Sequence, residues 1–373
     1  ATHRPAEQQA GAIRRVGLAA LDLPNLAASF WTPNGLRLPS AELVAATRGA
    51  RLPVMDDSGG RRTIVLMTIA SEFAFQRMFG SFVSSLASIT FPLRNGTVSS
   101  LARHLVVNVM NAGSMDSCTR VAGQYGAWCV NYSHRDFAAG NFDTHSNDFY
   151  GIGFTKTATI LDGLSLGLDV LFLDADQTLF RNPLPYLLAR QVDVLVTGDC
   201  HNHDDRTPAD RLPPVNNNIG FVYFRSTAMV TRAVYNWGLH LANIARRGEK
   251  PWDQLTFGGA MEFISLEVSV RHLSLGMLRP DLFPYLCMAT CGCNLRGVPL
   301  LQNGLLAKLN KNESTTPHFY YCDAELMQDW YAFHFPCATD MNGKAALMAE
   351  YSLMYQKVVG PLNSRSGLLN VLV

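Results

Sequence analysis

The stretch Leu171–Pro183, LFLDADQTLFRNP, decides the fold of this chain. Its approach, Asp169–Leu173 (DVLFL), has the composition of a buried β-strand. The strand ends at Asp174-Ala175-Asp176, and residues two positions apart on a strand point the same way. Two carboxylates therefore converge at the carboxyl end of a strand, where hard oxygen ligands suit Mg²⁺ or Mn²⁺ with a phosphate-bearing ligand. A solvated acidic turn is the alternative interpretation.

Strand and helix patterns alternate on both sides of this stretch. Strands are expected at 63–69, 104–110, 127–132, 169–173, 192–197 and 220–225, and helices at about 72–86, 154–168 and 230–244. This alternation predicts an α/β protein with a mostly parallel, doubly wound sheet. Such sheets bind ligands at the carboxyl ends of their strands.

Composition excludes several classes of protein. The chain has 373 residues, of which 48% are hydrophobic, so it can bury a core and is not disordered. Lys and Arg (31) nearly balance Asp and Glu (30), and a net charge of +1 gives no general attraction for nucleic acid or an anionic membrane. No segment has the roughly 20 unbroken apolar residues of a membrane span. We expect a soluble globular protein, with any signal peptide or anchor outside the sequence shown.

Cysteines and glycosylation sequons favour the secretory pathway. Five of the eight cysteines lie in the last quarter of the chain, which is compatible with disulfides in an oxidising compartment. Sequons begin at Asn95, Asn131 and Asn312. A cytosolic protein with buried thiols is the alternative. The cysteines at 287–293 disfavour a zinc site, because their spacing is not paired C-x-x-C and no His is near in sequence.

Two enzyme classes compete for the acidic motif. The first is a phosphatase of the haloacid dehalogenase type, whose D-x-D-x-T-L signature is matched by Asp174, Asp176, Thr178 and Leu179. There Asp174 would be the nucleophile and Asp176 the general acid/base. The acidic stretch 198–204 imitates that family's last motif, but it follows too soon for the intervening Ser/Thr and Lys strands. Several strand–helix units also precede the motif, which should open the sheet.

The second class is a metal-dependent glycosyltransferase, which four motifs in order indicate. They are Lys156 ahead of GLDVLFLDAD at 167–176, RNPL at 181–184, NIGFVYFRS at 218–226 and WDQ at 252–254. Over about residues 61–345 the chain resembles the nucleotide-diphospho-sugar transferase family, which includes glycosyltransferase family 77 and builds cell-wall and glycoprotein glycans. The chain departs from the family after the second Asp, where Gln177-Thr178-Leu179 replace apolar residues and Trp.

The resemblance implies a GT-A fold, which is Rossmann-like. Residues 1–60 would be an N-terminal extension or stem, 61–275 the nucleotide-sugar-binding core, and 276–373 a Cys-containing part that completes the metal and acceptor sites. The implied activity is retaining transfer of a pentose or hexose from a UDP-sugar, held through Mn²⁺ or Mg²⁺, to a glycan or glycoprotein acceptor. The expected compartment is the Golgi lumen or another part of the secretory pathway. The sugar, the acceptor and the choice between covalent and front-face mechanisms stay open.

The resemblance also implies the metal ligands and the catalytic residues. The metal would be held by Asp176, by Asp174 directly or through water, and by His334. Asp253 and Gln254 would be catalytic, with the Asp253 carboxylate beside the anomeric carbon. The alternatives are a core histidine for His334 and an N-terminal helix cap for Asp253.

The donor would be contacted by a further set of residues. These are Thr68, Ala70, Lys156, Asp174, Asp199, Asn218, Gly220 and Lys344. Lys156 and Lys344 would meet the phosphates, and Gly220 would let the backbone approach the sugar. A solvated charge is the alternative for Lys156, and a turn before a strand is the alternative for Asn218.

A hypothesis of a different kind is a catalytically silent, secreted carbohydrate-binding protein that keeps the fold. It predicts glycan binding that is unaffected by chelation and by Asp176→Asn.

Overall fold

A computed structural model describes most of the chain. The described residues are 31–32, 35–36, 39–93, 95–132, 146–198, 217–267, 273–286, 290–291, 327–336 and 341–359. The strands of the main sheet are β3 (Leu52–Met55), β4 (Arg61–Ala70), β7 (Leu105–Val109), β8 (Trp128–Asn131), β9 (Asp169–Leu173), β11 (Val194–Gly198), β12 (Asn217–Phe224) and β13 (Leu275–Met277). Their order is β13-β11-β12-β9-β4-β7-β8, with β3 paired to β4.

The main sheet is mostly parallel. Strands β9, β4, β7 and β8 are parallel to one another, as are β11 and β13. Strand β12 is antiparallel to both β9 and β11. Strand β4 lies between β7 and β9, so the chain continues from β4 to β7 and β8 on one side and returns through α7 to β9 on the other. Doubly wound sheets bind ligands where the strand order changes direction in this way, at the carboxyl ends of the strands. Asp174 directly follows β9 at this edge.

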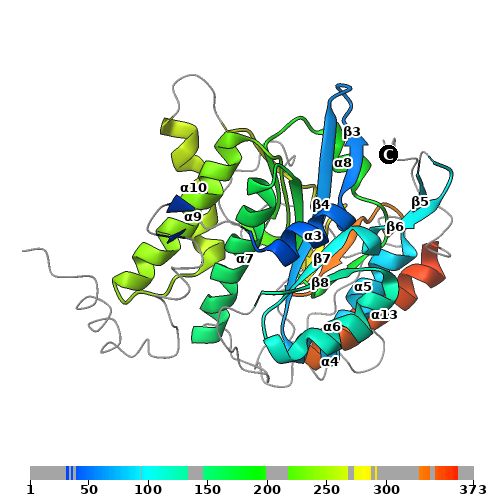
Figure 1. Ribbon diagram of the computed structural model, residues 1–373. Helices are drawn as coiled ribbons and strands as arrows, with labels where there is room; N and C mark the ends of the chain where they lie inside the picture. The colour runs from blue at the N-terminus through cyan, green and yellow to red at the C-terminus, as the bar shows by residue number, and fades with distance from the viewer. Residues whose placement is uncertain are drawn as a thin grey trace, which may run out of the picture.

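Helices cover both faces of the sheet (Figure 1). One face carries α4 (Glu72–Arg77), α5 (Phe79–Ser88), α6 (Met115–Val121), α8 (Leu184–Ala189) and α13 (Met341–Val359). The other carries α3 (Ala41–Ala50), α7 (Asn147–Ser165), α9 (Ala228–Arg246) and α10 (Asp253–Glu267). Alternate residues of β4 enter the two cores, Ile64 and Leu66 into the first and Val65 and Met67 into the second. The predicted doubly wound α/β class is confirmed.

A smaller sheet lies beside the acidic turn and positions the candidate site. It has the order β10-β16-β14-β15, formed by β10 (Gln177–Leu179), β16 (Ala332–His334), β14 (Tyr285–Leu286) and β15 (Thr290–Cys291). In the antiparallel pairing of β10 with β16, Gln177 lies opposite His334. This pairing brings a distant segment of the chain next to the Asp-x-Asp turn.

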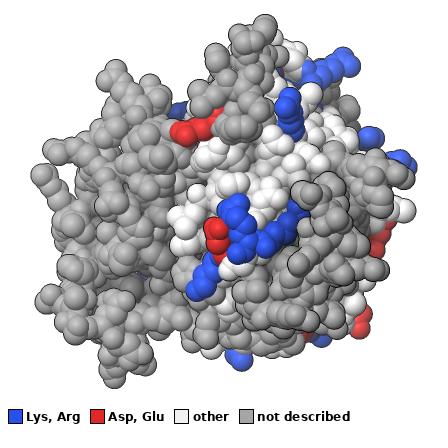
Figure 2. Space-filling view, turned by 90° about the vertical axis from the view of Figure 1, so that its left-hand side faces the viewer, with Lys and Arg blue, Asp and Glu red and all other residues white. Residues whose placement is uncertain are grey.

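The remaining elements are short. They are β1 (Trp31–Thr32), β2 (Gly35–Leu36), β5 (Thr90–Pro92), β6 (Val98–Ser100), and the 3₁₀ turns η1 (Leu101–His104), η2 (Ala112–Ser114) and η3 (Gly123–Tyr125). On the face seen in Figure 2, basic side chains group around an acidic one among largely uncharged atoms. The exposed end of α9 has such a mixture, where Arg247 Nε donates to Glu249 Oε1 (2.6 Å). No helix among the described residues has the length and apolar character needed to cross a bilayer.

Two expectations need correction or comment. The helix expected at 72–86 is divided at Met78, which ends α4 and precedes α5. Residues 41–55 belong to the predicted extension, yet they form α3 and β3, and Leu43, Ala50 and Leu52 are completely buried in the cores. The division into three domains stays a prediction.

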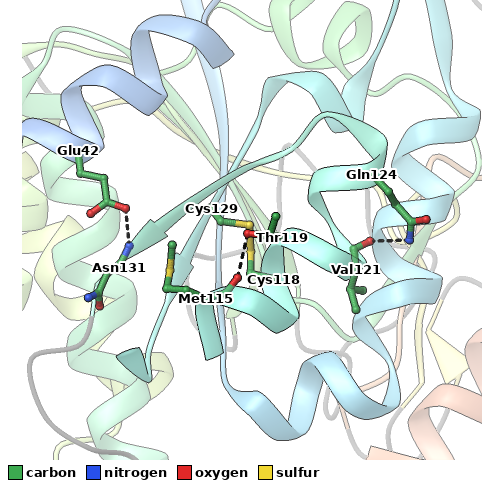
Figure 3. Close-up of a disulfide and its surroundings, with 8 residues drawn as sticks. All are labelled: Glu42, Met115, Cys118, Thr119, Val121, Gln124, Cys129 and Asn131. Carbon is green, nitrogen blue, oxygen red and sulfur yellow. Dashed lines mark hydrogen bonds between the residues drawn. A yellow bond between two sulfur atoms is a disulfide. The ribbon is translucent and has the colours of Figure 1, made fainter. Parts of the chain in front are cut away.

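A disulfide joins Cys118 of α6 to Cys129 of β8 (Figure 3). The same strand is tied to α3, because Asn131 N donates to Glu42 Oε1 (3.0 Å). A disulfide is therefore present, as the cysteine content predicted. Cys287, Cys293 and the sequon at Asn312 lie outside the described residues.

We expect the double variant Cys118→Ala/Cys129→Ala to lose about 2–4 kcal/mol of unfolding free energy, because the bond restricts the unfolded chain. Urea denaturation of the variant and of the oxidised parent measures this loss. The parent in excess reductant is the matched control and should approach the variant. Equal denaturation midpoints for variant and oxidised parent would contradict the prediction.

Candidate functional site

Backbone and amide hydrogen bonds fix the acidic turn between β9 and β10. Asp174 N donates to Gly220 O of β12 (2.7 Å). The side chain of Gln177 is buried, and its Nε2 donates to Asp174 O (2.8 Å) and Gly220 O (2.7 Å). Gln177 thus fastens the turn to β12. This gives a structural role to a residue at which the sequence departs from the family pattern.

Asp176 is the more buried of the two acids of the turn and is 8% exposed. Its Oδ1 lies 2.9 Å from His334 Nε2, and its Oδ2 accepts a hydrogen bond from Lys344 Nζ (2.5 Å). Burial alone would raise the pKa of Asp176, but the Lys344 ammonium group and His334 hold that pKa well below its usual range. Asp176 is therefore an ionised carboxylate at neutral pH.

Gly220 makes room for His334. A Cβ atom at Gly220 would lie 2.2 Å from His334 Cε1 and 2.7 Å from its Nδ1 and Nε2, so no other residue fits without moving the ring. The sequence predicted that Gly220 lets the backbone approach the donor sugar. In the structure, the neighbour that requires the glycine is the imidazole ring. His334 itself is 6% exposed, and its buried Nδ1 has no hydrogen-bond partner in the described part of the chain.

A second cluster surrounds Lys156 of α7. Its Nζ lies 3.0 Å from Asp174 Oδ1 and 3.7 Å from Asp253 Oδ2, and 5.3 Å from the centre of the Phe172 ring. Lys156 is 5% exposed, so its alternative interpretation as a solvated charge is wrong. Burial would lower the pKa of Lys156, but Asp174 and Asp253 raise it overall. A buried ammonium group therefore joins the two carboxylates.

Asp253 begins α10 and packs against α7. A Cβ atom at Gly153 would lie 2.9 Å from the Cβ and Cγ of Asp253, so this glycine permits the close approach. Asp253 Oδ1 accepts from Gln254 N (2.9 Å). Burial raises the pKa of Asp253, Lys156 lowers it and Asp174 raises it, and the net effect is a rise. The carboxylate thus lies at the start of a helix, beside the acidic turn.

Three side chains in this part of the chain can act together as metal ligands. Asp174, Asp176 and His334 each offer one ligand atom, and these atoms lie within 4.8 Å of one another. The 2.9 Å between Asp176 Oδ1 and His334 Nε2 matches the separation of about 3 Å between adjacent ligands at about 2.1 Å from an octahedral ion. The two carboxylates favour Mg²⁺ or Mn²⁺. The residues present therefore fit the implied divalent cation.

The remaining residues predicted to contact the donor differ in burial and in their place in the fold. Thr68 of β4 is completely buried and Ala70 is 3% exposed, so neither side chain is presented at the surface. Asn218 lies inside β12, where its Oδ1 accepts from Gly220 N (3.1 Å), and the interpretation as a turn before the strand is wrong. Asp199 lies outside the described residues. The contacts of these residues with a donor stay predictions.

The amino end of β9 carries another acid, Asp169, with a structural role. Arg62 pairs with both carboxylate oxygens (2.5 Å each), Tyr223 Oη donates to Oδ2 (2.6 Å) and Ser226 N donates to Oδ1 (2.7 Å). Burial raises the pKa of Tyr223 well above its usual value, and Asp169 adds to the rise. The Asp169 carboxylate is thus saturated by protein donors and joins β4, β9 and the end of β12.

Sequence reasoning missed Gly153 and Gln177. Gly153 lies just before the predicted helix, and its i, i+3 spacing from Lys156 places both on one face of the observed α7. Gln177 was noticed only as a departure from the family pattern.

Comparison with known proteins identifies one family. The profile of the nucleotide-diphospho-sugar transferase family matches residues 100–348. A search of curated proteins finds no match. Solved structures similar to the chain include mouse xyloside xylosyltransferase 1 in its apo form, with 11% identity, a TM-score of 0.38 and coverage of 74% of this chain and 98% of that one.

Two further structures are the glycosyltransferase GlyE of Streptococcus pneumoniae TIGR4 and the WbbM bifunctional glycosyltransferase. GlyE shares 9% identity with a TM-score of 0.37, covering 79% of this chain and 63% of its own. WbbM shares 11% identity with a TM-score of 0.38, covering 79% of this chain and 51% of its own. The chain thus spans about half to two thirds of these two proteins. Because the family profile covers residues 100–348 of 373, the chain, with its mostly parallel α/β sheet, belongs to the nucleotide-diphospho-sugar transferase family.

Proposed function

We propose that the protein is a metal-dependent, retaining glycosyltransferase that moves a pentose or hexose from a UDP-sugar to a glycan or glycoprotein acceptor. The observation that carries this proposal is the cluster of Asp174, Asp176 and His334 at the carboxyl edge of the parallel sheet. The family supports a nucleotide-sugar donor. A pair of carboxylates with an imidazole at this edge suits a cation that meets a diphosphate.

The chemistry requires that the departing diphosphate be neutralised. A bound Mn²⁺ or Mg²⁺ supplies a Lewis acid for this purpose. Asp174, Asp176 and His334 would hold the ion, and Gln177 keeps the turn in place for it. Preorganised charges of this kind need no rearrangement at the moment of reaction.

Asp253 is the carboxylate best placed to act on the donor sugar. It lies beside Asp174 and is joined to it through Lys156. A carboxylate at this position would stabilise positive charge that develops at the anomeric carbon, or orient the acceptor hydroxyl. Gln254 follows it on α10 and would contact the sugar.

We also propose that the protein acts in the Golgi lumen or another secretory compartment. The Cys118–Cys129 disulfide supports an oxidising compartment, because such bonds rarely persist in the cytosol.

The test is a calorimetric titration of the protein with UDP in Mn²⁺ and then in EDTA, with GDP as the matched control nucleotide. We expect the affinity for UDP to be higher in Mn²⁺ than in EDTA by about 100-fold or more, since the cation would join the carboxylates to the diphosphate. A panel of UDP-sugars is then scored for UDP release, and the anomeric configuration of the product is read by NMR. Absence of UDP binding in both conditions would overturn the proposal.

The two alternative functions, a phosphatase and a silent carbohydrate-binding protein, predict different results with the same preparation. A phosphatase would hydrolyse p-nitrophenyl phosphate in Mg²⁺ and lose that activity with Asp174→Asn. A silent carbohydrate-binding protein would bind glycans equally well in Mn²⁺ and EDTA.

A further inference from the structure

Each acid of the Asp-x-Asp turn is held by its own lysine. Lys156 Nζ lies 3.0 Å from Asp174 Oδ1, and Lys344 Nζ lies 2.5 Å from Asp176 Oδ2. With Asp253, the site contains three carboxylates and two ammonium groups, so its net charge is close to −1 when His334 is neutral. This charge is small for a site that must hold a divalent cation.

The two lysines differ in how firmly they are held. The Lys156 side chain is 6% exposed and lies between two carboxylates. The Lys344 side chain is 18% exposed and pairs with one carboxylate. Lys344 also lies in the first turn of α13, whereas Lys156 lies in the middle of α7. Lys344 is therefore the lysine that can leave its carboxylate at the lower cost.

Lys344 and a divalent cation would share the same carboxylate. A cation held by Asp176 and His334 would lie at Oδ1, whereas the ammonium group of Lys344 lies at Oδ2. Like charges a few ångströms apart in a buried site repel one another strongly, because little water screens them. An anion that contacts both cations would remove this repulsion.

We propose that Lys344 couples cation binding to nucleotide binding. Its ammonium group competes with the divalent cation for Asp176, and moves to the diphosphate when the cation and the nucleotide bind together. This inference rests on the proposed function, because the anion is the diphosphate of the donor. By thermodynamic linkage, UDP must strengthen cation binding by the same factor by which the cation strengthens UDP binding.

The experiment measures Mn²⁺ affinity from the EPR signal of the free ion, with and without saturating UDP. The proteins are the parent chain, Lys344→Met, Lys344→Arg, and Lys357→Met, an exposed lysine on the same helix. In the parent and in Lys357→Met, we expect UDP to strengthen Mn²⁺ binding by the reciprocal factor, about 100-fold or more. In Lys344→Met, we expect the affinity for Mn²⁺ alone to exceed that of the parent by about 5-fold or more. The UDP effect, which is the factor by which UDP strengthens Mn²⁺ binding, should fall about 10-fold.

Each outcome decides between supporting and overturning the inference. Lys344→Arg keeps the positive charge and should keep most of the UDP effect. The inference is overturned if Lys344→Met binds Mn²⁺ alone no more tightly than the parent, or if the UDP effect is unchanged. Thermal denaturation confirms that each variant is folded. If the parent itself bound no UDP in Mn²⁺, the proposed function would fail first, which separates the two failures.

Discussion

The Asp176→Asn chain is expected to bind UDP no more tightly in Mn²⁺ than in EDTA, a loss of about 100-fold or more relative to the parent. Asp176 is flanked by His334 on one oxygen and Lys344 on the other. An asparagine would direct its amide NH₂ group at one of these neighbours and would bring no negative charge to the cation. The measurement is the calorimetric titration with UDP, repeated on the variant.

The matched control is Asp57→Asn, which neutralises an exposed acid in the turn between β3 and β4. It should bind UDP as the parent does, with the same dependence on Mn²⁺. If Asp176→Asn kept its metal dependence, the cation would have to be held elsewhere, and the assignment of Asp174, Asp176 and His334 as ligands would be wrong.

The Lys156→Met variant is expected to lose about 3–5 kcal/mol of unfolding free energy. Lys156 is buried, and its ammonium group compensates the carboxylates of Asp174 and Asp253. Removing it leaves the buried carboxylate of Asp253 and the half-buried carboxylate of Asp174 close together without their shared counter-charge. Urea denaturation measures the loss, with the exposed Lys250→Met as the control variant.

A double-mutant cycle identifies the cause of this loss. Asp253→Asn removes one of the two uncompensated charges, so it should cost much less in the Lys156→Met background than in the parent chain. Additive effects in the cycle, or a loss of less than about 1 kcal/mol for Lys156→Met alone, would show that Lys156 does not hold these carboxylates together.

Much of the fold follows from local sequence patterns. The strand at 169–173 was predicted with its observed limits, because strands buried on both faces of a parallel sheet are continuous apolar runs. The break at Met78 was not predictable, because residues on either side of it keep the apolar content of one helix. Residues 41–55 show no sustained period, so their membership of the cores depends on long-range contacts that a local pattern does not contain.

The candidate site was also predictable from the sequence only in part. The convergence of Asp174 and Asp176 follows from the strand period, and the resemblance to the family predicted His334 as their partner. The ion pairs of Lys156 with Asp253 and of Lys344 with Asp176 could not be predicted from local patterns, because each joins distant parts of the chain. Lys344 and Asp176, for example, are 168 positions apart. No spacing in the sequence indicates such a pair, and only the folded sheet shows which lysine serves which acid.

The order of these residues along the chain matters while the protein is being synthesised. His334 follows Asp176 by 158 positions, and α13 with Lys344 comes later still. Because the amino-terminal part of a chain leaves the ribosome and folds first, both acids and Lys156 emerge well before the imidazole ring. A nascent chain can thus assemble most of the sheet while it still lacks His334 and Lys344. Sugar nucleotides would then meet a complete binding site only after the segment that carries His334 and Lys344 has been synthesised and folded.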